Sequence, residues 1–163
     1  MPGLADLDVP RDFYWLFGGP APLAGMAYPA WPARWSEMHA AGFRHVICLA
    51  RDTFPYSPAP LSPLHAVGLE DLYGGLTPHD PAGEQRKIVA AAALAGERLA
   101  RGEGVIVHCA GGTGRTGTVI GCILRGLGFS ADEALAYLNR LHRSRGHDGW
   151  PESGWQAAAV EGL

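Results

Sequence analysis

Cysteine is scarce in this sequence: only three of its 163 residues, at positions 48, 109 and 122, are cysteines. Three thiols cannot all pair with one another, and their spacing does not match that of ligands for a structural metal ion. The chain is therefore expected to be neither a disulfide scaffold nor a domain held together by metal. A reducing compartment such as the cytoplasm is favoured.

Strong charge and long hydrophobic runs are also lacking. The formal net charge is −3, which gives no indication of binding to nucleic acid or to a membrane surface. No apolar run is long enough to span a bilayer, and residues 1–10 carry acids without an apolar core, so we expect no signal peptide. Internal repeats and low-complexity linkers are absent. The length predicts a single domain over residues 1–163, and we expect a monomer.

The most informative stretch of the sequence runs from Val105 to Gly117. An apolar run that ends at His108 predicts a short buried strand, and the apolar residues 119–127 predict a buried helix. Between them lies a glycine-rich loop, whose glycines permit unusual backbone angles and leave room for a ligand. The N–H groups of such a loop, together with the helix dipole, can bind an anion. Arg115, at the helix start, can hold two oxygens of a phosphate.

Cys109 stands at the mouth of this anion-binding loop. N–H dipoles, a helix N-terminus and a guanidinium all favour the thiolate over the thiol, and a thiolate is a strong nucleophile. The same loop that binds a phosphate could therefore prepare Cys109 to attack it. The residues predicted to bind the phosphate are Ala110, Gly111, Gly112, Thr113, Gly114 and Arg115.

Two other interpretations compete with this one. Cys109 could be an inert buried cysteine, although a glycine loop next to an arginine is an unusual place for one. Residues 112–117 also fit the G-x-G-x-x-G pattern of dinucleotide-binding enzymes. That pattern normally lies in the first βαβ unit and is followed about 20 residues later by an acid at the end of a strand. Here it lies two-thirds along the chain, and the next acids, Asp132 and Glu133, begin a helix.

The rest of the chain predicts alternating strands and helices. Ser130 and Glu133 form a capping box at the start of one helix, and Asp80 before Pro81 marks the start of another. The basic residues at the end of the helix after Ser130 are interpreted as solvated capping charges. Strands are predicted at residues 13–17, 23–26, 43–50 and 64–69, and helices at about 32–41, 81–101, 130–145 and 152–161. This alternation predicts an α/β fold with a central, mainly parallel sheet flanked by helices.

Cys109, five residues, Arg115 and then Thr116 match the signature of the cysteine-dependent protein tyrosine and dual-specificity phosphatases. His108, Gly114 and Gly117 extend the match. Outside the signature, the sequence resembles small atypical dual-specificity phosphatases more loosely, at Trp15, residues 23–26, 42–46 and 48–49. This resemblance implies the phosphatase fold and metal-independent hydrolysis of phosphomonoesters, without an organic cofactor.

The resemblance also implies a mechanism with a phosphocysteine intermediate on Cys109. His108 would orient the loop, and Thr116 would donate a hydrogen bond to the departing thiolate. The Thr116 hydroxyl could also bond to the backbone of the helix start, and both roles can hold at once. The family carries an aspartate as general acid on a loop before the nucleophile strand. Asp71 directly follows an apolar strand and is favoured for this role. Asp80 lies at nearly the usual spacing, but its place before a proline suits a helix cap.

Five further residues are expected to have mainly structural roles. Gln156 could position the hydrolytic water, although a place on a surface helix is favoured. Trp150 and Trp155 are expected to pack in the core or in a lid. Cys48 could form a disulfide with Cys109 under oxidation, but a buried strand residue is the simpler interpretation, as is helix core for Cys122.

Because Ala110 and Thr113 carry no charge, the loop favours phosphotyrosine, phosphoserine or phosphothreonine in proteins, or a small phosphomonoester, over a phosphoinositide. A phosphate-binding module without catalysis remains the main alternative from another class.

Overall fold

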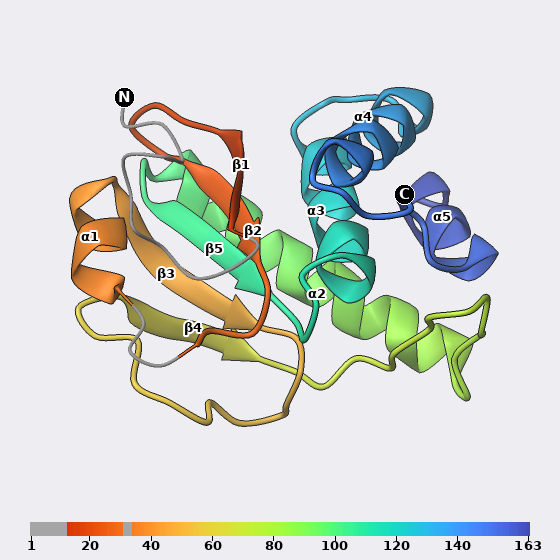
Figure 1. Ribbon diagram of the computed structural model, residues 1–163, viewed down its shortest axis with the longest axis horizontal. Helices are drawn as coiled ribbons and strands as arrows, with labels where there is room; N and C mark the ends of the chain where they lie inside the picture. The colour runs from red at the N-terminus through yellow and green to blue at the C-terminus, as the bar shows by residue number, and fades with distance from the viewer. Residues whose placement is uncertain (1–12, 31–33) are drawn as a thin grey trace.

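The computed structural model describes residues 13–30 and 34–163. Its centre is a five-stranded sheet with the order β1-β2-β5-β3-β4, as Figure 1 shows. Four neighbouring strands, β2, β5, β3 and β4, run parallel, and β1 pairs antiparallel with β2 at the edge. The strands are β1 (Tyr14–Phe17), β2 (Leu23–Met26), β3 (Phe43–Cys48), β4 (Ser62–Ala66) and β5 (Gly104–His108). The prediction of a mainly parallel α/β sheet is confirmed.

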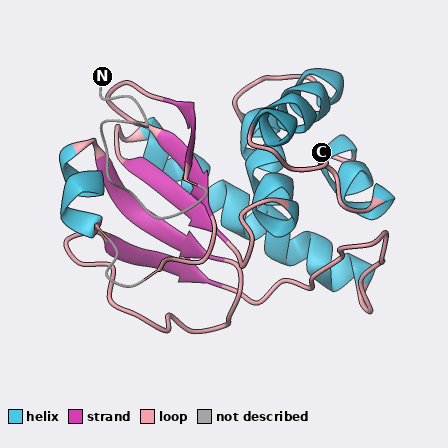
Figure 2. Ribbon diagram, viewed as in Figure 1, coloured by secondary structure: helices cyan, strands magenta, loops and turns pink. Residues whose placement is uncertain are grey.

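Helices cover both faces of this sheet (Figure 2). They are α1 (Trp35–Ala40), α2 (Pro81–Ala100), α3 (Gly114–Gly126), α4 (Ala131–Ser144) and α5 (Gly154–Glu161). Side chains alternate along each strand, so Ile106 of β5 packs with α1 on one face, while Val105 and Val107 pack with the other four helices on the opposite face. A parallel strand buried on both faces should be continuously apolar, as Val105–Val107 is.

Two predicted helix starts are confirmed by their hydrogen bonds. The Asp80 carboxylate accepts from the N–H of Gly83 at 3.0 Å and caps α2, which begins at Pro81. Ser130 and Glu133 make both bonds of a capping box at α4. Each acceptor satisfies a backbone donor that the first helical turn leaves without a partner.

Several predicted boundaries differ from those observed. The strand predicted at 43–50 ends at residue 48, and the strand predicted at 64–69 lies at 62–66, so it includes Pro63. Proline is tolerated there because β4 is an edge strand. The helix predicted at 32–41 runs from 35 to 40, with Arg34 as its N-cap and Ala41 as its C-cap, and residues 31–33 lie outside the described residues. The helix predicted from about residue 152 begins at residue 154.

The basic end of α4 was expected to be solvated, and this is wrong for two of its residues. His142 is fully buried, with its ring against that of Tyr14. The half-buried Arg145 also lies over the Tyr14 ring, with 3.9 Å between the guanidinium carbon and the ring centroid. Arg140 and Arg143 are exposed as expected. The fold brings the edge strand β1 against this helix end, which the helix pattern alone does not show. Among the described residues, no helix has both the length and the apolarity needed to cross a membrane.

Candidate active site

The glycine-rich loop connects β5 to α3 at the carboxyl ends of the parallel strands (Figure 1). Strand β5 ends at His108 and α3 begins at Gly114, so Cys109 is the first residue of the loop. The Cys109 side chain is only 2 % exposed, and the N–H of Gly112 donates to its Sγ at 3.3 Å. The sulfur therefore lies inside the loop, at the end of the sheet where open α/β folds bind their ligands.

The carbonyl groups of this loop are held by hydrogen bonds on its outer side. The bonds are Tyr28 N–H to Ala110 at 2.8 Å, Tyr14 O–H to Gly112 at 2.5 Å, Gly117 N–H to Thr113 at 2.8 Å, and both Thr118 O–H and Trp150 Nε1–H to Gly114 at 2.8 and 3.2 Å. A trans peptide directs its N–H opposite to its carbonyl. Each carbonyl that is held outside therefore turns the following N–H towards the inner side of the loop. This arrangement gives the loop a set of inward donors before any ligand binds.

His108, the residue before Cys109, is fully buried. Its Nδ1 lies 3.1 Å from the carbonyl oxygen of Cys109, and its Nε2 is hydrogen-bonded to the hydroxyl of Tyr56. Burial lowers the pKa of His108 to about 4, so the ring is neutral near pH 7 and carries one proton. Since a carbonyl can only accept, that proton lies on Nδ1 and Tyr56 donates to Nε2. No sequence pattern pointed to Tyr56 as the partner of His108.

Arg115 and Thr116 open helix α3. The half-buried Arg115 guanidinium lies 3.5 Å from the carbonyl oxygen of Leu69, on the loop that follows β4. The buried Thr116 hydroxyl has no hydrogen-bond partner among the described residues. The alternative in which it bonds to the backbone of the helix start is wrong, because no described acceptor lies within hydrogen-bond distance of this hydroxyl.

Asp71 and Asp80 lie in different surroundings. Asp71 lines a cavity of about 200 Å³ together with Cys109 and Arg115, and its carboxylate accepts from the N–H of Tyr73 at 3.1 Å. Asp80 is not among the residues that line this cavity, and its carboxylate caps α2. Of the two candidates, only Asp71 lines the cavity that Cys109 lines.

Glu152 is a second carboxylate at this cavity, and the sequence did not single it out for chemistry. Its carboxylate lies beside Gly114, in the space where a Cβ at that residue would be. Burial raises the pKa of Glu152, and the charge of Asp71 raises it further. The Glu152 N–H donates to the side-chain oxygen of Gln156 at 2.8 Å. Gln156 is 1 % exposed, so the expectation that it lies on a helix surface is wrong. Its buried side chain instead fixes the backbone of Glu152 through this hydrogen bond.

The remaining aromatic and sulfur residues pack as expected. Trp150 is buried, with its ring where a side chain at Gly117 would lie, and Trp155 is half-buried. Cys48 on β3 and Cys122 on α3 are buried and free. Among residues 13–30 and 34–163, no group of three His, Cys, Asp or Glu side chains could hold a metal ion.

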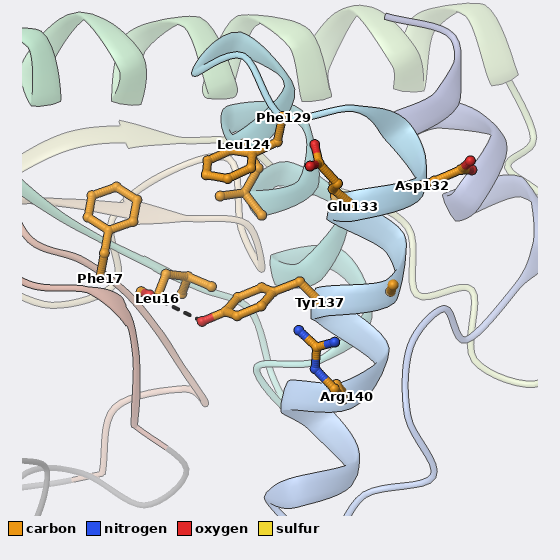
Figure 3. Close-up of a pocket in the computed structure, with 10 residues that line it drawn as sticks. Leu16, Phe17, Leu124, Phe129, Asp132, Glu133, Tyr137 and Arg140 are labelled. Atoms are coloured by element: carbon orange, nitrogen blue, oxygen red, sulfur yellow. Dashed lines mark hydrogen bonds between the residues drawn. The ribbon is translucent and has the colours of Figure 1, made fainter.

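Two of the other cavities are relevant here, one beside this site and one distant from it. One of about 480 Å³ adjoins it, because Tyr73, Thr113, His147 and Glu152 line both. The other, of about 600 Å³, lies between β1 and α4 and is lined mainly by apolar side chains such as Leu16, Phe129 and Tyr137 (Figure 3). None of the predicted site residues lines the larger cavity.

Solved structures with this fold define its class. The chain has a TM-score of 0.62 and 26% identity to Tk-PTP in its active form, over 86% of this chain and 90% of that one. It has a TM-score of 0.63 and 17% identity to the catalytic core of the PP-IP phosphatase SIW14 from S. cerevisiae, over 95% and 86%. TpbA of P. aeruginosa in complex with pTyr gives a TM-score of 0.60 and 17% identity, over 89% of this chain and 81% of that one. The fold is that of the protein tyrosine and dual-specificity phosphatases.

The family follows from the sequence match. Residues 10–148 match the family model PTP-SAK, described as the DSP-PTPase phosphatase domain of a Swiss Army Knife protein. The chain belongs to this family and is a phosphatase domain of the atypical dual-specificity type. The predicted resemblance is confirmed, and the dinucleotide-binding alternative has no support.

Proposed function

We propose that this protein is a metal-independent phosphatase that hydrolyses phosphomonoesters through a phosphocysteine on Cys109, with residues 1–163 forming one catalytic domain. One observation carries the proposal: Cys109, Arg115 and Asp71 line the same cavity, at a loop whose carbonyls are held outward. A nucleophile, a cation for the phosphoryl oxygens and an acid for the leaving group are the parts that phosphoryl transfer requires.

In the first step, the Cys109 thiolate attacks phosphorus in line with the leaving oxygen. An S–P bond forms as the P–O bond breaks, and Asp71 gives its proton to the departing oxygen. The inward N–H groups of residues 110–115 and the Arg115 guanidinium stabilise the charge on the equatorial oxygens. These donors are fixed by the surrounding helices and strands, so little rearrangement accompanies the reaction.

In the second step, Asp71 accepts a proton from a water molecule that attacks phosphorus. The S–P bond breaks, inorganic phosphate leaves, and the thiolate is restored. The buried Thr116 hydroxyl makes no bond to another described residue, and we propose that it turns to donate a hydrogen bond to the thiolate as it departs. The neutral His108, fixed between Tyr56 and the Cys109 carbonyl, keeps the loop in place through both steps.

The proposed substrates carry a single phosphate, as phosphotyrosine, phosphoserine or phosphothreonine in a protein. The fold does not choose among substrates, since TpbA was solved with pTyr and PTPMT1 with PI(5)P. The cavity of this chain favours one phosphate because Ala110 and Thr113 are uncharged and the carboxyl groups of Asp71 and Glu152 line its wall. Carboxylates repel the additional phosphates of a polyanion.

Turnover of para-nitrophenyl phosphate in the presence of EDTA tests the proposal. We expect hydrolysis that is inhibited by vanadate and lost in Cys109→Ser, and alkylation of Cys109 by iodoacetate at mildly acidic pH faster than that of an ordinary free thiol. Phosphopeptide binding without turnover would instead identify a phosphate-binding module. A melting temperature that rises with NAD but not with vanadate would indicate a nucleotide site.

A further inference from the structure

The side chain of Tyr14 reaches the nucleophile loop from the edge strand β1. Its hydroxyl donates to the carbonyl oxygen of Gly112 at 2.5 Å, across 98 residues of sequence, and the side chain is 1 % exposed. Tyr14 faces Gly25 of β2 in the sheet register. A side chain at residue 25 would overlap the Tyr14 ring, so the glycine opens the path by which the ring crosses β2.

The end of helix α4 also packs against the Tyr14 ring. The buried His142 ring meets it edge to face at 5.2 Å between centroids, and the Arg145 guanidinium lies 3.9 Å from its centroid. Burial lowers the pKa of His142 to about 3, so this ring is neutral and Arg145 supplies the positive charge. A cation over a phenol ring withdraws electron density from it, which strengthens the hydroxyl as a donor.

Gly112 is the glycine of the loop that has a left-handed backbone conformation. Its φ of +77° lies in the left-handed region, and a Cβ there would come within 2.6–2.7 Å of the backbone of residues 26 and 27. Its N–H donates to the sulfur of Cys109 at 3.3 Å, while its carbonyl points to Tyr14. Because Gly112 can rotate more freely than other residues, its carbonyl needs an external partner to keep one orientation.

We infer that Tyr14 is a positioning residue for the proposed phosphatase reaction: its hydroxyl holds the Gly112 carbonyl outward and thereby directs the N–H of Thr113 into the cavity. The trans peptide between residues 112 and 113 makes the two directions opposite. Thr113 lines the cavity with Cys109, so its N–H becomes one of the donors to the phosphoryl oxygens. This inference rests on the function proposed above.

Tyr14→Phe tests the inference because it removes only the hydroxyl and keeps the packing of the ring. Tyr137→Phe is the matched control: Tyr137 also donates to a backbone carbonyl, that of Leu16 on the same strand, at 3.2 Å (Figure 3). We expect Tyr14→Phe to weaken vanadate inhibition and to lower kcat/KM for para-nitrophenyl phosphate by about tenfold or more, and Tyr137→Phe to stay within about twofold of wild type.

An NMR titration of the wild-type protein with vanadate supplies a measurement that does not depend on how either variant folds. The amide proton of Thr113 should shift downfield as it bonds to the anion, and in folded Tyr14→Phe this shift should shrink. A Thr113 amide that ignores vanadate while those of Gly114 and Arg115 respond overturns the role of Tyr14. Equal kinetics in the two variants overturn it as well. Wild-type protein that neither turns over nor binds vanadate overturns the proposed function itself.

Discussion

Asp71 and Asp80 should respond to mutation in opposite ways, because Asp71 lines the cavity with Cys109 and Asp80 caps a helix. Asp71→Ala removes the carboxyl group proposed to protonate the leaving oxygen, and general acid catalysis is typically worth about 10²–10⁴ in rate. Its structural contact is one bond to an exposed N–H, so its stability should change little. Asp80→Ala removes the N-cap of α2, which costs about 0.5–2 kcal/mol. For a chain of this length, each kcal/mol lowers Tm by about 2–4 °C.

Steady-state kinetics and thermal unfolding of the two variants together check this expectation. Asp71→Ala should lose turnover, and more with phenyl phosphate than with para-nitrophenyl phosphate, because a poorer leaving group needs the proton more. Its vanadate affinity should survive. Asp80→Ala should melt at a lower temperature but keep kcat at a temperature where it is folded. If Asp80→Ala loses turnover as severely as Asp71→Ala while still folded, the assignment of the acid is wrong.

Three further substitutions test the packing around the site. Tyr56→Phe leaves the buried Nε2 of His108 without its donor, so the unfolding free energy in urea should fall by about 1–3 kcal/mol, and an unchanged value would contradict the assigned tautomer. Burial and a neighbouring carboxylate raise the pKa of Glu152 in the folded protein. Its ionisation therefore lowers stability as pH rises above 4.5, the ordinary pKa of a glutamate. From about pH 4 to pH 7, the Tm of Glu152→Gln should decline less than that of wild type, and equal declines would refute the pKa shift. Gly117→Ala places a Cβ 2.5 Å from the Trp150 ring, so the free energy of unfolding in denaturant should fall by about 1–3 kcal/mol. An unchanged value would show that the Trp150 ring moves aside without cost.

The predictions that succeeded rest on short-range patterns. The strand that ends at His108, the glycine loop and the helix start are contiguous in sequence, and each has a local cause in apolar runs, glycine angles or capping. The capping box at Ser130 and the cap at Asp80 are likewise complete within four residues. The strand observed at 62–66 was predicted at 64–69, which shows the limit of such patterns. It can include Pro63 only because it lies at the edge of the sheet, and the local sequence does not show this position.

The sequence by itself determined the class of fold, the family and the nucleophile loop, because these are encoded by residues that are neighbours in the chain. Only the tertiary structure decided which side chains support that loop. Tyr14 and Tyr56 reach it across 98 and 52 residues, and Gln156 is buried where a helix surface was expected. The physical reason is that a loop needs outside partners for its carbonyls, and any nearby donor can serve. Which donor is nearby depends on how the sheet and helices pack, and no local pattern specifies that.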